Sequence, residues 1–158
     1  MARRQQAFAF EACTEIEFSP DHFQQQAGLV CYYNGHKFHY LYLSRDERGR
    51  HLGIMSCPGD QSLDTIYPVN DKPVMLPDSG PVYLQATVNR EQLQFAWSPD
   101  GVAWHAVGET LDYSLLCDEV GKGEGANFTG AFVGLCCQDI AGTAKPADFR
   151  WFSYREFD

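Results

Sequence analysis

The side chains that could perform catalysis or bind a metal are present, but their spacing does not assemble a site. His36 and His39 lie three residues apart in an alternating run, and a strand directs side chains at that spacing to opposite faces. The sequence has no CxxC or HExxH pattern beside them, and no GxSxG, Walker-type or Rossmann glycine pattern elsewhere. We therefore expect neither a metal nor an organic cofactor.

Pairs of carboxylates are the other candidates for chemistry, because a glycosidase needs two of them about 5 to 10 Å apart. The pairs at suitable sequence spacing are Glu109 with Asp112 and Asp118 with Glu119. Helix capping and solvated surface charge are the simpler interpretation of both pairs. We therefore assign no catalytic residue to this chain.

Aromatic residues, at 14% of the chain, are the more informative class. Exposed tyrosine and tryptophan rings on a β surface can stack on sugar rings. Most of the aromatic residues follow the two-residue period of a strand and are expected in the core: Phe8, Phe10, Phe18, Tyr40, Tyr42, Phe95, Trp97, Phe132, Phe149 and Trp151. Four remain as candidates for exposure: Phe128 and the candidate sugar-stacking residues Trp104, Tyr32 and Tyr33.

The elements that position these rings are predicted to be strands, because apolar residues alternate with polar ones between turn signals. In residues 7–20 the alternation puts Phe8, Phe10 and Phe18 on one face and the glutamates on the other. Asn34-Gly35, between two alternating runs, predicts a hairpin. The segment SPDGVAW, residues 98–104, is interpreted as a structural hairpin. The remaining strands are expected within residues 27–46, 50–57, 81–108, 129–139 and 147–157.

The fold class that follows is all-β, a two-sheet antiparallel sandwich with one short helix. The helix is expected at residues 113–120, with Asp112 as its N-cap. No linker or repeat interrupts the sequence, so we expect a single domain over residues 1–158. The side chains predicted to point inward are Phe10, Phe18, Leu29, Phe95, Phe132 and Leu135.

Charge and composition exclude several classes of partner. The formal net charge of -9 repels phosphate backbones and anionic lipid, so no nucleic acid is expected. No apolar run approaches the roughly 20 residues of a membrane span, and no membrane partner is expected. The six cysteines lie in or beside apolar runs, and we expect reduced thiols and a cytoplasmic location.

Five segments, in order, resemble the C-terminal module of the β-xylosidases and α-L-arabinofuranosidases of glycoside hydrolase family 43. They are RRQQAFAFEACTEIEF, QQAGLVCYYN, FAWSPDGVAW, FTGAFVGLCCQD and KPADFRWFSYREF, and they are distributed along the chain from Arg3 to Phe157. The resemblance implies a concanavalin A-like jelly roll packed on a five-bladed β-propeller, which holds the catalytic carboxylates. It also implies a xylan-binding carbohydrate module.

The propeller and the opening strands of that module have no counterpart in this sequence. The resemblance therefore implies a C-terminal piece of a longer glycosidase, with the propeller and xylan-type oligosaccharides as partners. We expect a non-catalytic accessory domain that binds xylo-oligosaccharides weakly, completes the propeller's pocket, or does both. The alternative is a β-xylosidase by descent whose catalytic residues lie outside this chain. The missing strands would leave an unpaired sheet edge, so a homo-oligomer is also expected.

Phe128 has a specific expected role. In the family, a phenylalanine of this module reaches across the interface to line the propeller's sugar pocket, and Phe128 is the position that matches it best. It follows a glycine-rich loop, which permits backbone shapes closed to other residues. The resemblance therefore implies that Phe128 is a substrate-pocket residue.

Overall fold

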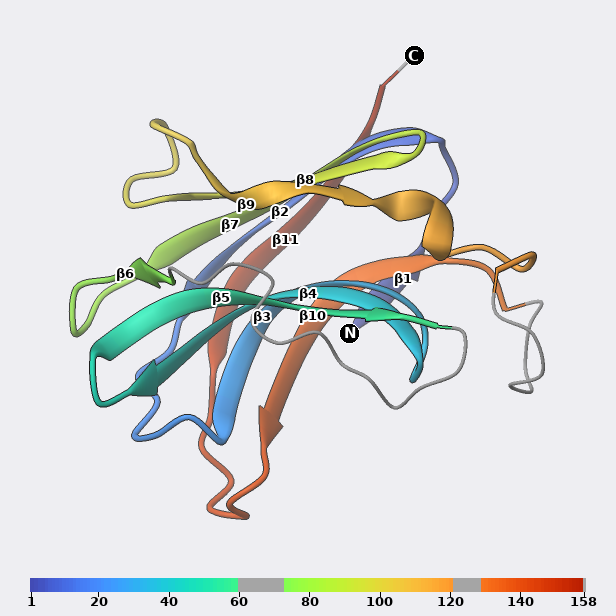
Figure 1. Cartoon of the computed structure of the whole chain (residues 1–158). Coiled ribbons are helices and arrows are strands. Elements are labelled where there is room, and N and C mark those ends of the chain that lie inside the picture. The colour runs from blue at the N-terminus through green and yellow to red at the C-terminus, as the bar shows by residue number, and fades with distance from the viewer. Residues whose placement is uncertain (60–72, 121–128, 158) are drawn as a thin grey trace.

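Two antiparallel sheets face each other in the computed structural model, which describes residues 1–59, 73–120 and 129–157 (Figure 1). Within these ranges, the first sheet has six strands in the order β1 (Ala2–Arg4), β10 (Phe132–Asp139), β3 (Gln25–Asn34), β4 (Lys37–Asp46), β5 (Gly49–Pro58) and β6 (Val74–Met75). The second has five, in the order β11 (Asp148–Glu156), β2 (Ala9–Glu17), β7 (Val82–Asn89), β8 (Gln92–Ser98) and β9 (His105–Asp112). The predicted all-β, two-sheet antiparallel sandwich is confirmed.

The predicted helix is shorter than expected. A single turn of 3-10 helix, η1 (Tyr113–Leu115), takes the place of a helix over residues 113–120. Asp112 is its N-cap as predicted, because the Asp112 side chain accepts a hydrogen bond from the Ser114 N–H at 2.9 Å. Among the described residues, no helix reaches the length and apolar character that a membrane crossing requires.

The core lies between the sheets and follows the alternation of the strands. Phe10, Phe18, Leu29 and Phe95 point inward and are buried, as predicted, and Leu135 packs against them while partly exposed. Phe132 does not point inward. It pairs with Tyr32 on the outer face of the first sheet, and its neighbour Val133 takes the core position.

Two other aromatic residues expected in the core are exposed, for different reasons. Phe8 is 78% exposed because it precedes β2, which begins at Ala9, and so lies outside the strand alternation. Trp151 is 41% exposed because a bulge in β11, between Phe149 and Trp151, reverses the alternation. Trp151 consequently pairs with Glu15 on the outer face of the second sheet.

Candidate functional site

One end of the sandwich collects turns from both sheets. There, the segment before β2, the β3–β4 turn, the β7–β8 turn, η1 and the start of β10 lie together, at the right of Figure 1. We call this the η1 end, made up of residues 4–8, 34–37, 89–92, 113–118 and 129–131. The strands place these turns together because each strand that ends or begins there runs antiparallel to its neighbour.

A cavity of about 880 Å³ opens at the η1 end. This volume lies within the range of roughly 300 to 1,000 Å³ that small-molecule sites in proteins occupy. Its lining combines arginine, glutamine and glutamate side chains with apolar ones, and includes Arg4, Gln5, Phe8, Arg90, Glu91, Gln92, Tyr113, Leu116, Gly130 and Ala131.

Hydrogen bonds between distant segments fix the cavity lining. The Arg90 N–H donates to the Phe8 carbonyl at 2.7 Å, and the Tyr113 N–H donates to the Glu91 carbonyl at 2.8 Å. The Tyr113 hydroxyl donates to the Gln5 side chain at 2.9 Å. Burial raises the pKa of Tyr113 well above its ordinary value, so the hydroxyl keeps its proton even at alkaline pH. The cavity is therefore held open by bonds that do not depend on a ligand.

Gly130, just before β10, allows the side chain of Arg4 in β1 to approach the backbone closely. Its φ is +74°, and a Cβ atom there would lie 2.6 Å from Nη1 of Arg4. The Arg4 guanidinium lies 5.2 Å from the centre of the Phe132 ring, on the same outer face as Tyr32. Any larger residue at position 130 would therefore require the Arg4 guanidinium to shift and would adopt a φ that favours glycine.

The predicted site residues do not form one cluster. Tyr32 is 39% exposed, as expected, on the outer face at the η1 end. Trp104 is partly exposed in the β8–β9 turn, at the opposite end of β8. Tyr33 is only 2% exposed, so the expectation of exposure was wrong for this residue, which points into the core. Phe128 lies outside the described residues.

The segment SPDGVAW is a structural turn, as predicted. The Asp100 carboxylate accepts hydrogen bonds from the backbone N–H groups of Val102 and Ala103 at 2.8 and 2.9 Å. These bonds, more than any other contact, lower the pKa of Asp100. These bonds hold the turn that leads into Trp104.

Two of the four carboxylates considered for catalysis have structural partners. Asp112 caps η1, and Asp118 accepts a hydrogen bond from the Tyr33 hydroxyl. Glu109 and Glu119 are exposed. Among the described residues, no group of three or more histidine, cysteine and acidic side chains converges as a metal site would require.

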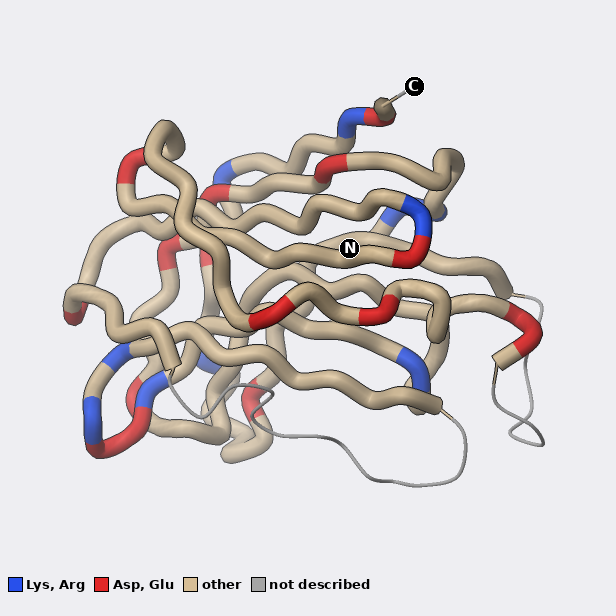
Figure 2. The backbone as a smooth tube through the Cα atoms, turned by 45° about the horizontal axis from the view of Figure 1, so that its top comes forward, with Lys and Arg blue, Asp and Glu red and all other residues tan. Residues whose placement is uncertain are grey.

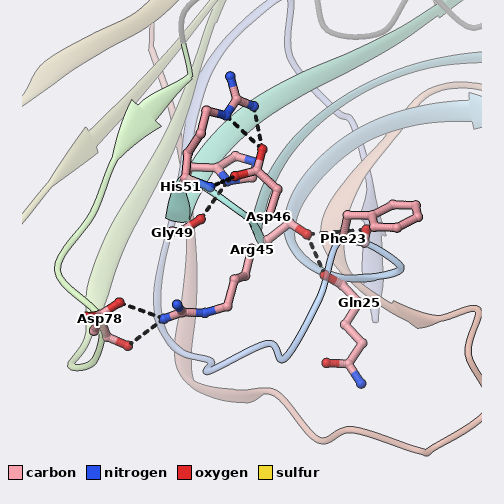
Figure 3. Close-up of polar contacts among 9 residues, drawn as sticks. Phe23, Gln25, Arg45, Asp46, Gly49, His51 and Asp78 are labelled. Carbon is pink, nitrogen blue, oxygen red and sulfur yellow. Dashed lines mark hydrogen bonds and ion pairs between the residues drawn. The ribbon is translucent and has the colours of Figure 1, made fainter.

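Several charged side chains elsewhere on the molecule form ion pairs. Figure 2 shows acidic positions spread over strands and turns of both sheets. At the β4–β5 hairpin, far from the η1 end, Arg45 pairs with Asp78 at 2.8 Å and His51 lies 3.8 Å from Asp46 (Figure 3). The first contact connects the β4–β5 hairpin to the segment that follows β6, and the second lies within the hairpin.

Sequence reasoning missed the cavity because its lining comes from turns that lie far apart along the chain. It placed Phe8 in the core, although Phe8 lies at this cavity and is exposed. One signal in the sequence was available. The polar run RRQQ precedes the first long strand, and polar residues there are compatible with an exposed segment that connects the two sheets. The pairing of β1 with β10 has no such signal, since three residues carry no periodicity.

The fold and the comparisons agree on the class of protein. The sandwich matches the family described as "Beta xylosidase C-terminal Concanavalin A-like domain" over residues 1–155, so the chain belongs to this family of concanavalin A-like domains. The chain is 40% identical over 157 residues to the "Beta-xylosidase" of Bacillus subtilis, and 40% identical over 158 residues to "Xylosidase/arabinosidase 43B" of Humicola insolens. These matches cover 99% and 98% of this chain.

A solved structure shows the same arrangement. The xylan β-1,4-xylosidase from Bacillus halodurans C-125 superposes with a TM-score of 0.90 at 37% identity, over 98% of this chain and 29% of that one. The chain also spans 29% of the length of each of the two curated relatives above. It therefore corresponds to less than a third of these proteins.

Proposed function

We propose that this chain is the non-catalytic accessory domain of a β-xylosidase or α-L-arabinofuranosidase that acts on xylan-type chains. The observation that carries the proposal is the extent of the match: the whole chain aligns with 29% of enzymes named xylosidases. The carboxylates that the sequence offered for catalysis, where they are paired, serve as a cap or as a partner of Tyr33. The catalytic acid and base then belong to the β-propeller, the domain's partner.

The η1 end is the surface that we assign to the propeller. Phe8 exposes most of its ring there, beside the cavity, and an exposed apolar ring favours contact with another surface. Asp118 and Thr129, which flank the segment containing Phe128, both lie at this end. Phe128 would then line the sugar pocket, where an apolar ring excludes water without taking part in proton transfer.

The second candidate function, a β-xylosidase by descent, is favoured by the names of the relatives. The two candidates differ in what the isolated chain does to an aryl β-xyloside. The accessory-domain proposal predicts release of the aryl group at the uncatalysed rate, at any concentration of the chain. Turnover that scales with chain concentration and survives repurification would overturn it.

Three further properties belong to the same proposal. The domain binds xylo-oligosaccharides weakly by itself, with Tyr32 and Trp104 as the exposed candidates for ring stacking. The isolated chain associates with itself along the free edge of β11. It resides in the cytoplasm, a proposal supported by the free state of the six cysteines, which all lie in the described part of the chain.

A further inference from the structure

The cavity at the η1 end has two exposed arginines in its lining, Arg4 and Arg90. In the described part of the chain neither of them forms an ion pair, whereas four other arginines pair with aspartate or glutamate: Arg45, Arg48, Arg150 and Arg155. Among the described lining residues Glu91 is the one carboxylate, so two arginines against one glutamate leave a formal charge of +1. A cationic cavity on a chain with a net charge of -9 favours an anionic ligand.

Arg90 has a backbone conformation that favours glycine. It is the first residue of the two-residue turn between β7 and β8, and its φ is +56°. Hairpin turns of this length have a positive φ at that position and favour Gly, Asn or Asp there, because a longer side chain crowds the backbone. Residues held in such a conformation gather at binding sites, where the side chain is needed. The turn itself does not require an arginine, so its presence points to a use for the guanidinium group.

Contacts between distant segments hold both arginines at the cavity. The Arg90 N–H donates to the Phe8 carbonyl at 2.7 Å, which ties the β7–β8 turn to the segment before β2. The Arg4 guanidinium lies 5.2 Å from the centre of the Phe132 ring. The fold therefore brings two cationic groups from opposite sheets to one cavity.

The rest of the lining fits a sugar. Asn89 and Gln92 flank the β7–β8 turn, and a side-chain amide can both donate to and accept from a hydroxyl group. Phe8 is 78% exposed at the same cavity, and an exposed apolar ring can pack on the face of a sugar ring. The volume of about 880 Å³ is also far larger than a simple anion needs.

We propose that the cavity at the η1 end binds the carboxylate of an acidic sugar, a uronic acid attached to a xylan-type chain, with Arg4 and Arg90 as its ion-pair partners. A guanidinium group donates two parallel hydrogen bonds to a carboxylate, a geometry that a hydroxyl group does not match. The proposal rests on the proposed function, which supplies the xylan-type chain. It adds a substrate class to that function: chains that carry acidic side groups.

Calorimetric titration of the chain with two matched ligands tests the role of charge. One ligand is a xylotriose that carries a glucuronic acid, and the other is the methyl ester of the same compound, which has nearly the same shape and no charge. At low ionic strength the acid should bind about 3- to 10-fold more tightly than the ester, the ratio expected for exposed ion pairs. The ratio should fall towards one in about 0.5 M NaCl, because salt screens exposed charges.

Three variants locate the effect. Arg90→Gly and Arg4→Gln should each reduce the preference for the acid and leave the affinity for the ester unchanged. The melting temperature of Arg90→Gly should not fall, since glycine suits the positive φ at this position. Arg150→Gln is the matched control, because it removes the same charge at the opposite end of β2, where Arg150 pairs with Glu17 at 3.2 Å. This control should keep the preference for the acid.

Equal affinity for the acid and the ester, or no binding of the acid, would overturn the proposal and leave a carboxylate of the propeller as the partner of the two arginines. A preference that survives in both Arg90→Gly and Arg4→Gln would overturn it as well. So would inorganic phosphate that binds as tightly as the acid, because the cavity would then be a site for simple anions. Failure of the proposed function is distinguishable, since it shows as turnover of the aryl β-xyloside, whereas the ratio of acid to ester affinity measures binding alone.

Discussion

At the scale of single residues, His39 gives the domain a defined response to pH. It is 2% exposed, with Nδ1 2.8 Å from the Ser56 hydroxyl and Nε2 3.1 Å from the Asp112 carbonyl. Burial lowers the pKa of His39 below its ordinary value of 6.5, and the contact with the Asp112 carbonyl opposes that shift only in part.

The direction of the pH effect follows from proton binding. Below pH 6.5 the unfolded chain protonates this histidine more readily than the folded domain does, so stability falls as the pH drops from 6.5 towards the folded pKa. Urea unfolding at several pH values between 5 and 7 should show this loss in the wild type. The slope should be smaller in His39→Gln, which has no titrating ring. Equal slopes in both proteins would contradict the prediction.

A substitution of Phe128 tests whether this residue contributes to sugar affinity or to the stability of the domain. In a chimera that carries this chain in place of the matching residues of the Bacillus subtilis β-xylosidase, Phe128→Ala should weaken xylose affinity by about 10-fold, since the ring would lose roughly 1.5 kcal/mol of apolar contact. The melting temperature should not change. The control is Phe95→Ala in the core, which should cost about 3 to 5 kcal/mol of stability. Lost stability with unchanged affinity in Phe128→Ala would contradict the assignment.

Individual residues also show which side-chain positions could be predicted from the sequence and which could not. Alternation placed Phe10, Phe18 and Phe95 correctly because an uninterrupted strand directs every second side chain to the same face. It failed for Trp151 because one bulge reverses the order, and a bulge leaves no pattern in a single sequence. Tyr33 was expected to be exposed, although it shares a strand face with Leu29 and Cys31; all three are buried, and the Tyr33 hydroxyl donates to Asp118, 85 residues away.

At the scale of elements, the long strands were predictable and the short ones were not. Each long strand has at least seven residues, which is enough for a pattern of apolar positions to show, whereas β6 has two residues and β1 has three. The predicted helix was too long because burial of Tyr113 and Leu116 makes an apolar run without requiring more than one helical turn. The cavity at the η1 end could not be predicted, since it depends on which turns the sheets bring together.

The unpaired edge of β11 is expected to affect the association of the isolated chain in solution. In the described part of the chain, β11 pairs with β2 on one side only, and its inward residues Phe149, Phe152 and Tyr154 stay partly exposed. An unpaired strand with apolar flanks pairs readily with another strand. The isolated chain should therefore associate at high concentration, as measured by analytical ultracentrifugation.

Ser153→Lys tests whether that association uses β11. Ser153 is exposed on the outer face of the strand, and a lysine there disfavours pairing of edges without disturbing the core. The variant should be more monomeric than the wild type at equal concentration and equally stable. Association of the same strength in the variant, or a wild type that remains monomeric at millimolar concentration, would contradict the prediction.

At the scale of the whole molecule, the distribution of exposed rings limits how tightly the isolated domain can bind a sugar chain. Tyr32 lies at the η1 end and Trp104 lies at the opposite end of β8, so one short oligosaccharide cannot stack on both. A single stacked ring contributes about 1 kcal/mol beyond burial of its area. Binding must also offset the cost of ordering the ligand.

Titration of the isolated chain with xylotetraose should therefore give a Kd of the order of 1 mM, equivalent to about -4 kcal/mol. Because Arg4 lines the cavity and its guanidinium lies 5.2 Å from the centre of the Phe132 ring, which pairs with Tyr32, we expect the bound chain to lie at the η1 end and to involve Tyr32. Tyr32→Ala should weaken binding by about 3- to 10-fold, the loss of one stacked ring. Trp104→Ala is the matched control and should leave the Kd unchanged. Micromolar affinity in the wild type would contradict the expectation of weak binding. Loss of binding in Trp104→Ala alone would place the sugar-binding surface at the β8–β9 turn, away from the surface proposed to contact the propeller.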